Sequence, residues 1–531
     1  MTLLLRRLAL VVPLLLLPLD ATASHGSSAP HAYSPSATAP SPSATASFPA
    51  ASAPGPEACA HAGTADFNGD GFNDVVVGDP FGEPPDRWAG WGHLFLLSGT
   101  SRGFPDVVGR PFPSGGGLSG WTARAGHLDG DGCLDLVVAS PHWNGYVTDK
   151  SSNRVTLVPG AGTVTVYWGG PDFGRPGAAR LDLHAPSPRN EAHFGWSLAV
   201  ASGLLAVGAP YEDADGVPDS GAVYLYRFGG DRGRVPGDPR RITQQTPGVP
   251  GDGEAGDLFG WSVALGALAK GPAPDLAVGA PYEDTPLEGR TVRDSGAVTV
   301  LYDAAEGPGG WYRGKGWDLS KLTDQVPVNE GDLFGYSLSY GDAVGRLAAG
   351  APYADPLGAR DAGIVQIFSG GRTAPEPVPA WTFWQGNVGE ISEPRDAFGF
   401  SLAFSGGRDL VVGAPFDGDG THPETGAVHV LTLTPAGTAS GSTPSTEPPL
   451  AQPTRLVRSR GPQSFEHFGW SVSGAGEGWV IVGAPDRDGT GAIGLVRMGG
   501  TDAEPLRPGD GHIMPFDRTH HPTDFGATVA G

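Results

Sequence analysis

A two-part motif recurs along this chain at intervals of 61–71 residues and limits the folds that the chain can adopt. The clearest copy begins with Phe-Gly-Trp-Ser at residues 194–197, continues through a short apolar run, and ends with Val-Gly-Ala-Pro at 207–210. Further copies have Phe-Gly at 259, 334, 398 and 468, followed by Gly-Ala-Pro at 279, 350, 413 and 483. Self-similarity of this kind is the signature of repeat units that bury their cores against one another. The motif therefore predicts a repeat architecture.

Each repeat has room for about four short strands. Seven Gly-Ala-Pro-like elements can be counted if Gly78-Asp79-Pro80 and Ala139-Ser140-Pro141 are admitted. A polar loop and then an alternating apolar strand follow each element, as at Val223–Tyr226, and a weaker outer strand follows most of them, as at Trp381–Trp384. At ~5–6 residues per strand, such a unit has the content of one propeller blade. The abundance of glycine (85) and proline (52) is typical of an all-β chain with many turns.

The repeated residues have structural roles that explain why they recur. The aromatic ring of Phe-Gly is large enough to pack between adjacent sheets, and the glycine permits close backbone approach. Gly-Ala-Pro ends a strand because proline donates no ladder hydrogen bond. A residue that recurs in every unit serves every unit, so we expect the Trp-Ser pairs at Trp196, Trp261 and Trp470 to be structural rather than nucleophilic.

On these motifs the chain resembles the FG-GAP repeat proteins, which include the propeller head of integrin α subunits and secreted bacterial relatives. The resemblance covers Cys59–Gly531. It implies an all-β, seven-bladed β-propeller of four-stranded antiparallel blades, with calcium in some hairpin loops and adhesion or ligand binding on one face. Tryptophan-aspartate and kelch repeats are competing propeller types, but their periods of ~40–50 residues are too short.

The N-terminus has the pattern of a secretory signal peptide. Arg6 and Arg7 precede an apolar run over Leu8–Leu19, and Ala21–Ala23 is a small-residue cleavage site. We therefore expect a signal peptide at 1–23, a disordered Ala/Ser/Pro/Thr-rich spacer at 24–56 and the propeller at 57–531. The run is short for a membrane span, so the prediction is a secreted, extracellular or cell-surface protein without membrane insertion after signal cleavage.

The charge balance disfavours polyanionic partners. Lysine and arginine number 34 against 57 aspartates and glutamates, and 34 − 57 gives a net charge of −23. Nucleic acid and anionic membranes are therefore excluded as expected partners, whereas cations are favoured. The alternative explanation is that acidic loops keep a large extracellular protein soluble.

The strongest local motif runs from Asp66 to Asp74. Asp66, Asn68, Asp70 and Asp74 supply oxygen atoms at positions 1, 3, 5 and 9, and the Phe72 carbonyl can be a further ligand. This is the first part of an EF-hand-like loop without its final glutamate, and it predicts a Ca²⁺ site. The motif occupies the same place in FG-GAP proteins, in the hairpin before the Gly-Ala-Pro strand. The alternative is a plain Asp/Asn/Gly turn.

A second loop, 127–135, has a weaker form of the motif. The matching positions are Asp129, Asp131, Asp135 and the carbonyl of Cys133, but His127 replaces the first aspartate. Imidazole is a poor ligand for a hard cation, so we expect a weakened calcium site or one completed by water. The remaining five units lack the motif, which departs from integrins.

The last repeat is divided between the two chain ends. Phe525–Gly531 is the opening half of a repeat, whereas the unit around Gly78 has no Phe-Gly. Joining this tail to Ala65 restores the spacing of the second unit. The C-terminal tail is therefore predicted to supply the first strand of the first blade and to close the ring, which removes a sheet edge.

The two cysteines, Cys59 and Cys133, are expected to form a disulfide because the chain is predicted to be secreted. If Cys59 lay on the first strand of the first blade, it would lie ~20 Å from the hairpin of that blade and pairing would be difficult. A C-terminal closing strand frees Cys59 and makes the bridge feasible. A free buried pair is the alternative.

Three functions stay open at this stage. The first is a monomeric, calcium-stabilised adhesion or recognition module whose ligand is an extracellular protein or glycan. The second is a secreted lyase or hydrolase of polysaccharide or phospholipid with a pocket on the propeller axis, for which His142 and His193 are scattered candidates. The third is a surface scaffold without a discrete ligand. No His-Glu-x-x-His motif occurs, so no catalytic residue is assigned.

Overall fold

The computed structural model describes most of the chain after residue 64. The described residues are 59, 65–82, 92–99, 109–111, 119–149, 154–175, 177–229, 233–306, 312–322, 326–372, 374–436, 448–476, 478–507 and 524–531. The predicted signal peptide (1–23) and spacer (24–56) lie outside the described residues. All described residues belong to one compact unit, Ser52–Gly531.

The described residues form an all-β structure of four-stranded antiparallel sheets, which we number 1 to 7 in the order of their repeats. The strands of sheets 1 to 4, in hydrogen-bonded order, are β32 (Thr528–Ala530), β1 (Asp74–Asp79), β2 (His93–Ser98) and β3 (Gly109–Pro111); β4 (Thr122–Gly126), β5 (Asp135–Ser140), β8 (Thr163–Tyr167) and β9 (Arg180–Leu183); β10 (Leu198–Ala201), β11 (Leu204–Ala209), β12 (Ala222–Arg227) and β13 (Arg240–Ile242); β14 (Ser262–Gly266), β15 (Asp275–Ala280), β18 (Ala297–Leu301) and β19 (Gly314–Asp318).

The strands of sheets 5 to 7 are β20 (Ser337–Gly341), β21 (Arg346–Ala351), β22 (Ile364–Ser369) and β23 (Val378–Phe383); β24 (Ser401–Ser405), β25 (Asp409–Ala414), β26 (Ala427–Thr432) and β27 (Arg455–Ser459); β28 (Ser471–Gly474), β29 (Trp479–Ala484), β30 (Ala492–Arg497) and β31 (Asp502–Leu506). Sheets 6 and 7 are joined through a parallel pair, β27 and β31. The strands expected after each Gly-Ala-Pro and the outer strand near Trp381 are confirmed.

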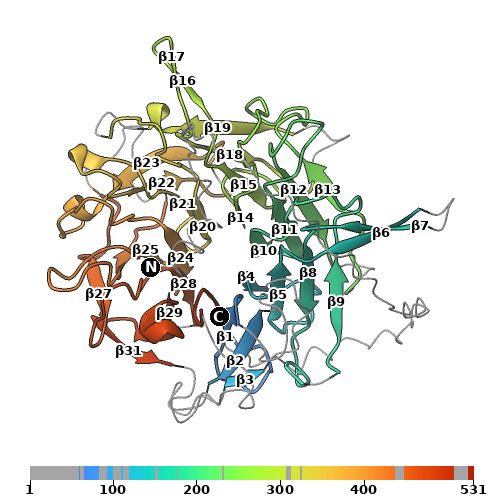
Figure 1. The fold of residues 1–531 in the computed structure, drawn as a ribbon, viewed down its shortest axis with the longest axis horizontal. Helices are drawn as coiled ribbons and strands as arrows, with labels where there is room; N and C mark the ends of the chain where they lie inside the picture. Colours follow the sequence, from blue (N-terminus) through green and yellow to red (C-terminus); the bar gives the residue numbers. More distant parts are fainter. Residues whose placement is uncertain are drawn as a thin grey trace, which may run out of the picture. The chain divides into compact units, whose positions relative to one another are not determined.

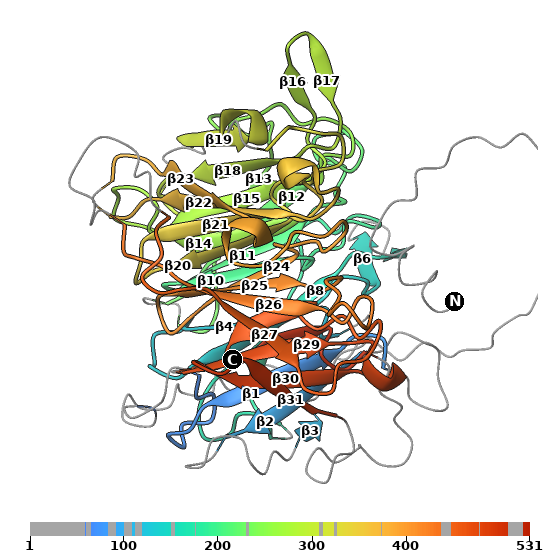
Figure 2. The same ribbon diagram turned by 90° about the vertical axis from the view of Figure 1, so that its left-hand side faces the viewer.

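Two hairpins and four short helices complete the described elements. The hairpins are β6 (Gly145–Asp149) with β7 (Arg154–Val158), and β16 (Thr285–Leu287) with β17 (Arg290–Val292). The helices are 3₁₀ turns: η3 (Leu319–Lys321), η4 (Pro356–Gly358), η5 (Gln385–Asn387) and η6 (Arg487–Gly489). Figure 2 shows β16 and β17 projecting beyond the sheets. A search of the described residues for helices long and apolar enough to cross a membrane finds none.

The first strands of successive sheets contact one another. These contacts join β4 to β10, β10 to β14, β14 to β20, β20 to β24 and β24 to β28. Figure 1 shows these six strands on the inner side of their sheets. The C-terminal strand β32 pairs with β1 through Val76–Ala530, Val77–Val529 and Gly78–Thr528, as the divided repeat predicted. It also contacts β28 on one side and β4 on the other.

The repeated motif residues have the structural roles expected of them. The Phe-Gly phenylalanines, such as Phe194 and Phe259, are fully buried within the clusters between sheets. A Cβ atom on Gly208, the glycine of one Gly-Ala-Pro, would lie 2.0 Å from the carbonyl oxygen of Gly260 in the next repeat, so only glycine fits there. The motif therefore sets the distance between neighbouring sheets.

The motif serine links each repeat to the next. The Oγ atoms of Ser197 and Ser262 donate to the carbonyl oxygens of Gly260 and Gly335 at 2.7 and 2.6 Å. The same bond recurs from Ser337, Ser401 and Ser471, and threonines take the serine place in two repeats, with Thr122 donating to Trp196 O and Thr528 to Trp121 O. The structural role predicted for the Trp-Ser pairs is confirmed.

Candidate functional site

The first predicted calcium loop is a tight turn directly before β1. Asp66 accepts hydrogen bonds from the backbone amides of Gly69 and Gly71, each at 2.7 Å. Gly69 and Gly71 have φ values of 77° and 89°, which lie in the left-handed region that favours glycine. Glycines at these positions let the backbone curl around the oxygen side chains. The loop is thus held in its turn by its own amides.

The other predicted ligands of this loop lie on the same turn. Asn68 Oδ1 accepts from Asp70 N at 2.8 Å, and Asp70 Oδ1 accepts from Phe72 N at 2.9 Å. Asp74 closes the loop, because its Oδ2 accepts from the amide of Phe67 at 3.1 Å. Asp66 and Asp74 are fully buried, whereas Asp70 is exposed.

The electrostatics of the first loop fit a cation. Burial raises the pKa of Asp74 to about 7, and the neighbouring charges of Asp70 and Asp66 add to the rise. Among the described residues, no basic side chain forms an ion pair with these three carboxylates. The donor set is all oxygen, which is the chemistry that Ca²⁺ prefers. No group of three or more His, Cys, Asp and Glu side chains in the described part of the chain converges on one point suited to a metal, so calcium ligation stays a prediction.

The second predicted loop has the same backbone hydrogen bonds. Asp129 Oδ1 accepts from Asp131 N at 3.1 Å, and Asp131 Oδ1 accepts from Cys133 N at 2.9 Å. Asp135 closes this loop as Asp74 closes the first, with Leu128 N donating to its Oδ2 at 2.9 Å. Burial raises the pKa of Asp135 to about 7, and Asp129 and Asp131 contribute to the shift.

Each predicted ligand of the second loop already has a further partner. The Arg234 guanidinium donates from Nε to Asp129 Oδ2 at 2.7 Å and from Nη2 to Asp131 Oδ2 at 3.2 Å. Ring atom Nδ1 of His127 donates to the Cys133 carbonyl at 2.9 Å. The outward-facing oxygen atoms of Asp129 and Asp131 are therefore engaged by a basic side chain. Sequence reasoning missed Arg234 because it lies more than 100 residues away, between β12 and β13 of the next repeat.

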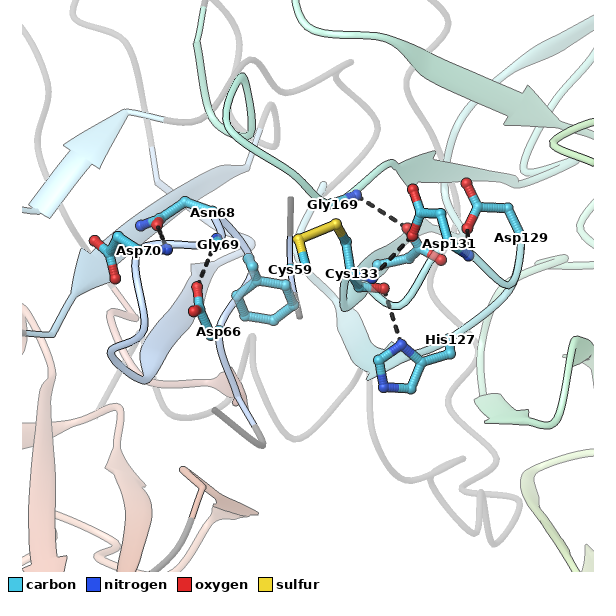
Figure 3. Close-up of a disulfide and its surroundings, with 12 residues drawn as sticks. Cys59, Asp66, Asn68, Gly69, Asp70, His127, Asp129, Asp131, Cys133 and Gly169 are labelled. Carbon is cyan, nitrogen blue, oxygen red and sulfur yellow. Dashed lines mark hydrogen bonds between the residues drawn. A yellow bond between two sulfur atoms is a disulfide. The ribbon is translucent and has the colours of Figure 1, made fainter. Parts of the chain in front are cut away.

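A disulfide joins the two loop regions. Cys59 and Cys133 are bridged with a Cα–Cα distance of 5.2 Å and a sequence separation of 74 residues. Figure 3 shows the bridge between the loops, with Asp66, Asn68 and Asp70 on one side and Asp129 and Asp131 on the other. The expected pairing is confirmed, and disulfides of this kind are typical of proteins outside the reducing cytosol.

A third loop of equal length, before β15, shows what the closing aspartate does alone. This loop, at residues 267–275, has no oxygen ligands at positions 3 and 5, where it has Ala269 and Gly271. Asp275 nevertheless accepts from the amides of Leu268 and Ala269 at 2.7 and 2.6 Å, and from Asp303 N at 2.8 Å. The closing aspartate is therefore a structural clamp in all three loops.

At the opposite end of the strands lies a band of contacting rings, which we call the aromatic belt. Its inner members follow Phe-Gly, or Ser-Gly in the case of Trp121, with neighbouring ring centroids 4.9–5.5 Å apart: Trp121, Trp196, Trp261, Tyr336, Phe400 and Trp470. Its outer members follow Gly-Ala-Pro and lie 5.2–6.2 Å from the inner ones: Tyr211, Tyr282, Tyr353 and Phe416. Most of these rings are half-buried, so the belt keeps some surface in contact with solvent.

Buried acids that sequence reasoning missed border the belt. Asp257, Asp332 and Asp396 stand two residues before Phe-Gly, and each accepts the amide of the residue three positions earlier at 2.6–2.8 Å. Burial raises their pKa values to about 6, 8 and 7, respectively. The recurrence of an acid at this position in four repeats, with Glu466 before Phe468 as the fourth, was the signal that could have revealed them.

Two histidines, His142 and His193, meet at the belt, and the place of His193 directly before Phe-Gly is taken by His467 in a later repeat. The rings of His142 and His193 lie 4.4 Å apart, and His193 also contacts Tyr211. Burial and, to a smaller extent, the nearby His193 lower the pKa of His142 to about 4. Nδ1 of His193 donates to the Pro141 carbonyl at 3.1 Å, so its Nε2 is the atom left to exchange a proton.

Comparison with known proteins identifies the repeats. The FG-GAP repeat family matches residues 182–226 and 392–431. Integrin alpha pat-2 of Caenorhabditis briggsae is 28% identical over 41% of this chain, and integrin alpha-5 of Xenopus laevis is 29% identical over 42%. The chain spans only 17% and 20% of the lengths of these two relatives.

Among solved structures, the periplasmic gluconolactonase PpgL of Pseudomonas aeruginosa is similar over 86% of this chain and 98% of its own. Its sequence identity is 14% and its TM-score 0.44, and a likeness of this size carries no argument about function. The sequence matches are informative where the structural match is not. The chain contains FG-GAP repeats and is a distant relative of integrin α subunits over about two fifths of its length.

Proposed function

We propose that the chain is a secreted recognition module built on a closed seven-bladed β-propeller at residues 57–531 and stabilised by calcium. Closure is supported by the hydrogen bonds between repeats. They run from Ser471 to Gly526, from Thr528 to Trp121 and from Thr122 to Trp196, so the first and last repeats are linked in the same way as the others. A closed ring leaves no inner sheet edge for unwanted pairing.

The aromatic belt carries the proposal of recognition. Aromatic side chains are enriched at protein interfaces because they offer large contact areas at low entropic cost. The belt is continuous across six repeats. An extracellular protein partner that presents a basic side chain fits this chemistry, since a cation is attracted to ring faces. A glycan that stacks on the rings is the other ligand class.

Calcium has a supporting part in this proposal. The first loop precedes β1 and the belt follows its far end, so the strand length of about 20 Å separates the two. Asp66, Asn68, Asp70, Asp74 and the Phe72 carbonyl would hold the ion. Binding only to the folded protein stabilises it by mass action, without contact between the ion and the partner.

The test is capture of a partner from the surface extract of the producing cell. We expect Tyr282→Ala/Tyr353→Ala to reduce capture at least tenfold, because both rings belong to the solvent-contacting part of the belt. Phe72→Ala is the matched control, since this ring is 38% exposed at the other end of the sheet. Equal capture by wild type, by the double tyrosine variant and by Phe72→Ala would overturn the belt as the binding surface. Capture by none of these proteins would favour a scaffold.

A second candidate function rests on the His142–His193 pair. Both imidazoles are held neutral by burial, and a neutral imidazole beside Tyr211 is suited to general base catalysis. The substrate class would be a polysaccharide or a phospholipid. Assays with chromogenic glycosides and phosphodiesters test this: turnover that His193→Gln abolishes and Tyr353→Ala retains would establish the enzyme, and no turnover would leave the recognition module.

A further inference from the structure

We infer that Arg234 is a built-in cation of the second loop, so that residues 127–135 are ordered by a guanidinium and not by calcium. The inference goes beyond the proposed function, because it concerns a loop that the family resemblance assigns to the metal. It rests on the partners of Asp129, Asp131 and Cys133, which the first loop does not share.

The two carboxylates present matched oxygen atoms to the guanidinium. The Oδ1 atoms of Asp129 and Asp131 accept amides of their own loop, which leaves both Oδ2 atoms facing outward, and Arg234 binds both of these. The planar fork of arginine suits two adjacent carboxylates better than a point charge does. The guanidinium therefore contacts the oxygen atoms that a metal ion at this loop would need.

The position of Arg234 is supported from outside the loop. Its guanidinium carbon lies 5.1 Å from the ring centroid of Trp168, which holds the charge by a cation–π contact. The side chains are largely withdrawn from water, with 16% of Arg234, 2% of Asp129 and 4% of Asp131 exposed. Removal of one partner from such a buried pair leaves an uncompensated charge, which is costly.

The remaining predicted ligands are also occupied. The Cys133 carbonyl accepts from His127, and Asp135 accepts from the amides of Leu128 and Gly169 with its two oxygens. His127 thus supports the same outcome as Arg234, since the residue that replaces the first aspartate also engages a predicted ligand. The arginine comes from sheet 3 and the loop from sheet 2, so the contact also fastens two neighbouring sheets.

A double-mutant cycle measured by melting temperature in chelator tests the inference in the full chain. The proteins are wild type, Arg234→Gln, Asp129→Asn/Asp131→Asn and the triple variant. We expect Arg234→Gln to lower the melting temperature clearly in the wild-type background and to have little effect once both aspartates are neutral. Arg234→Lys should give an intermediate loss, because lysine keeps the charge but not the fork.

Arg175→Gln is the matched control, because its ion pair with Asp172 is exposed and should contribute little. Equal losses in both backgrounds, or no loss at all, would overturn the inference. A second arm adds Ca²⁺ to Asp70→Ala, which removes a ligand of the first loop: we expect no rise in melting temperature. A rise that Asp129→Asn/Asp131→Asn removes would show metal in the second loop and overturn the inference. If wild type also shows no rise, the calcium part of the proposed function fails, while the cycle in chelator still supports Arg234.

Discussion

The loops at 66–74 and 127–135 share their length, their turn hydrogen bonds and their closing aspartate, yet they compensate negative charge in different ways. The first has an Asp-Asn-Asp set with no basic partner among the described residues, and the second has Arg234 across Asp129 and Asp131. A pattern of ligand residues in the sequence therefore specifies the shape of the turn more firmly than it specifies which cation compensates the carboxylates. What fills the turn depends on residues far away in the chain.

The largest expected effect comes from the bond that ties the loops together. Cys59→Ser/Cys133→Ser should lower the free energy of unfolding by roughly 2–5 kcal/mol, because the bridge closes a long segment of the unfolded chain. Urea unfolding measures the loss. If the first loop binds calcium independently of the second loop, calcium should still stabilise this variant. Loss of that stabilisation would contradict the difference between the two loops.

Calcium itself should separate the two loops. At a concentration ~100 times Kd, calcium should add about 2.7 kcal/mol to the free energy of unfolding. Asp70→Ala should remove this increment, and Asp131→Ala, at the equivalent position of the second loop, should leave it in place. Thermal unfolding with calcium or with chelator measures the increment in each variant. An increment that is lost only when Asp131 is replaced would place the calcium in the second loop.

The third loop, at residues 267–275, separates the effect of the closing aspartate from any effect of a cation, because it lacks the other oxygen side chains. Asp275→Asn should cost roughly 1–2 kcal/mol with or without calcium, because an amide cannot accept all three backbone N–H groups that the carboxylate accepts. Asp342→Asn in the exposed turn before β21 is the control. A cost that calcium relieves would mean that this loop also binds the ion.

The last prediction concerns the pH dependence of stability that Asp332, which lies outside the three loops, should cause. Burial raises the pKa of Asp332 to about 8 from 3.8, and Asp355 and Asp361 add to the rise. Because the folded pKa is the higher one, the proton stabilises the fold fully below the unfolded pKa, and this stabilisation is lost as the pH rises through about 8. Asp332→Asn should therefore become more stable relative to wild type as the pH is raised from 5 to 8, whereas the exposed Asp172→Asn should not. An unchanged pH profile would show that the proton is not held there.

Much of the fold could be predicted because the residues that define the strands of each repeat lie close together in the sequence. The spacing of Phe-Gly and Gly-Ala-Pro located the strands, and the half repeat at Phe525 predicted the pairing of β32 with β1. The turn of the first loop could be predicted because its oxygen side chains and glycines are contiguous, whereas calcium binding there stays a prediction. The contacts of Arg234, the clamp at Asp275 and the aromatic belt could not be predicted from the sequence. Each depends on which segments the fold brings together, and the spacing of motifs along the chain does not reveal those contacts.

The pairing of β32 with β1 also has a consequence for the order of events during synthesis. Strand β1 leaves the ribosome more than 400 residues before its neighbour, so its inner edge waits without a partner until the last residues of this sequence are made. Sheets 2 to 7 can form on the growing chain, while sheet 1 is completed only after residues 528–530 have been made. A truncation before Thr528 would therefore act on the first sheet to be translated and the last to be finished.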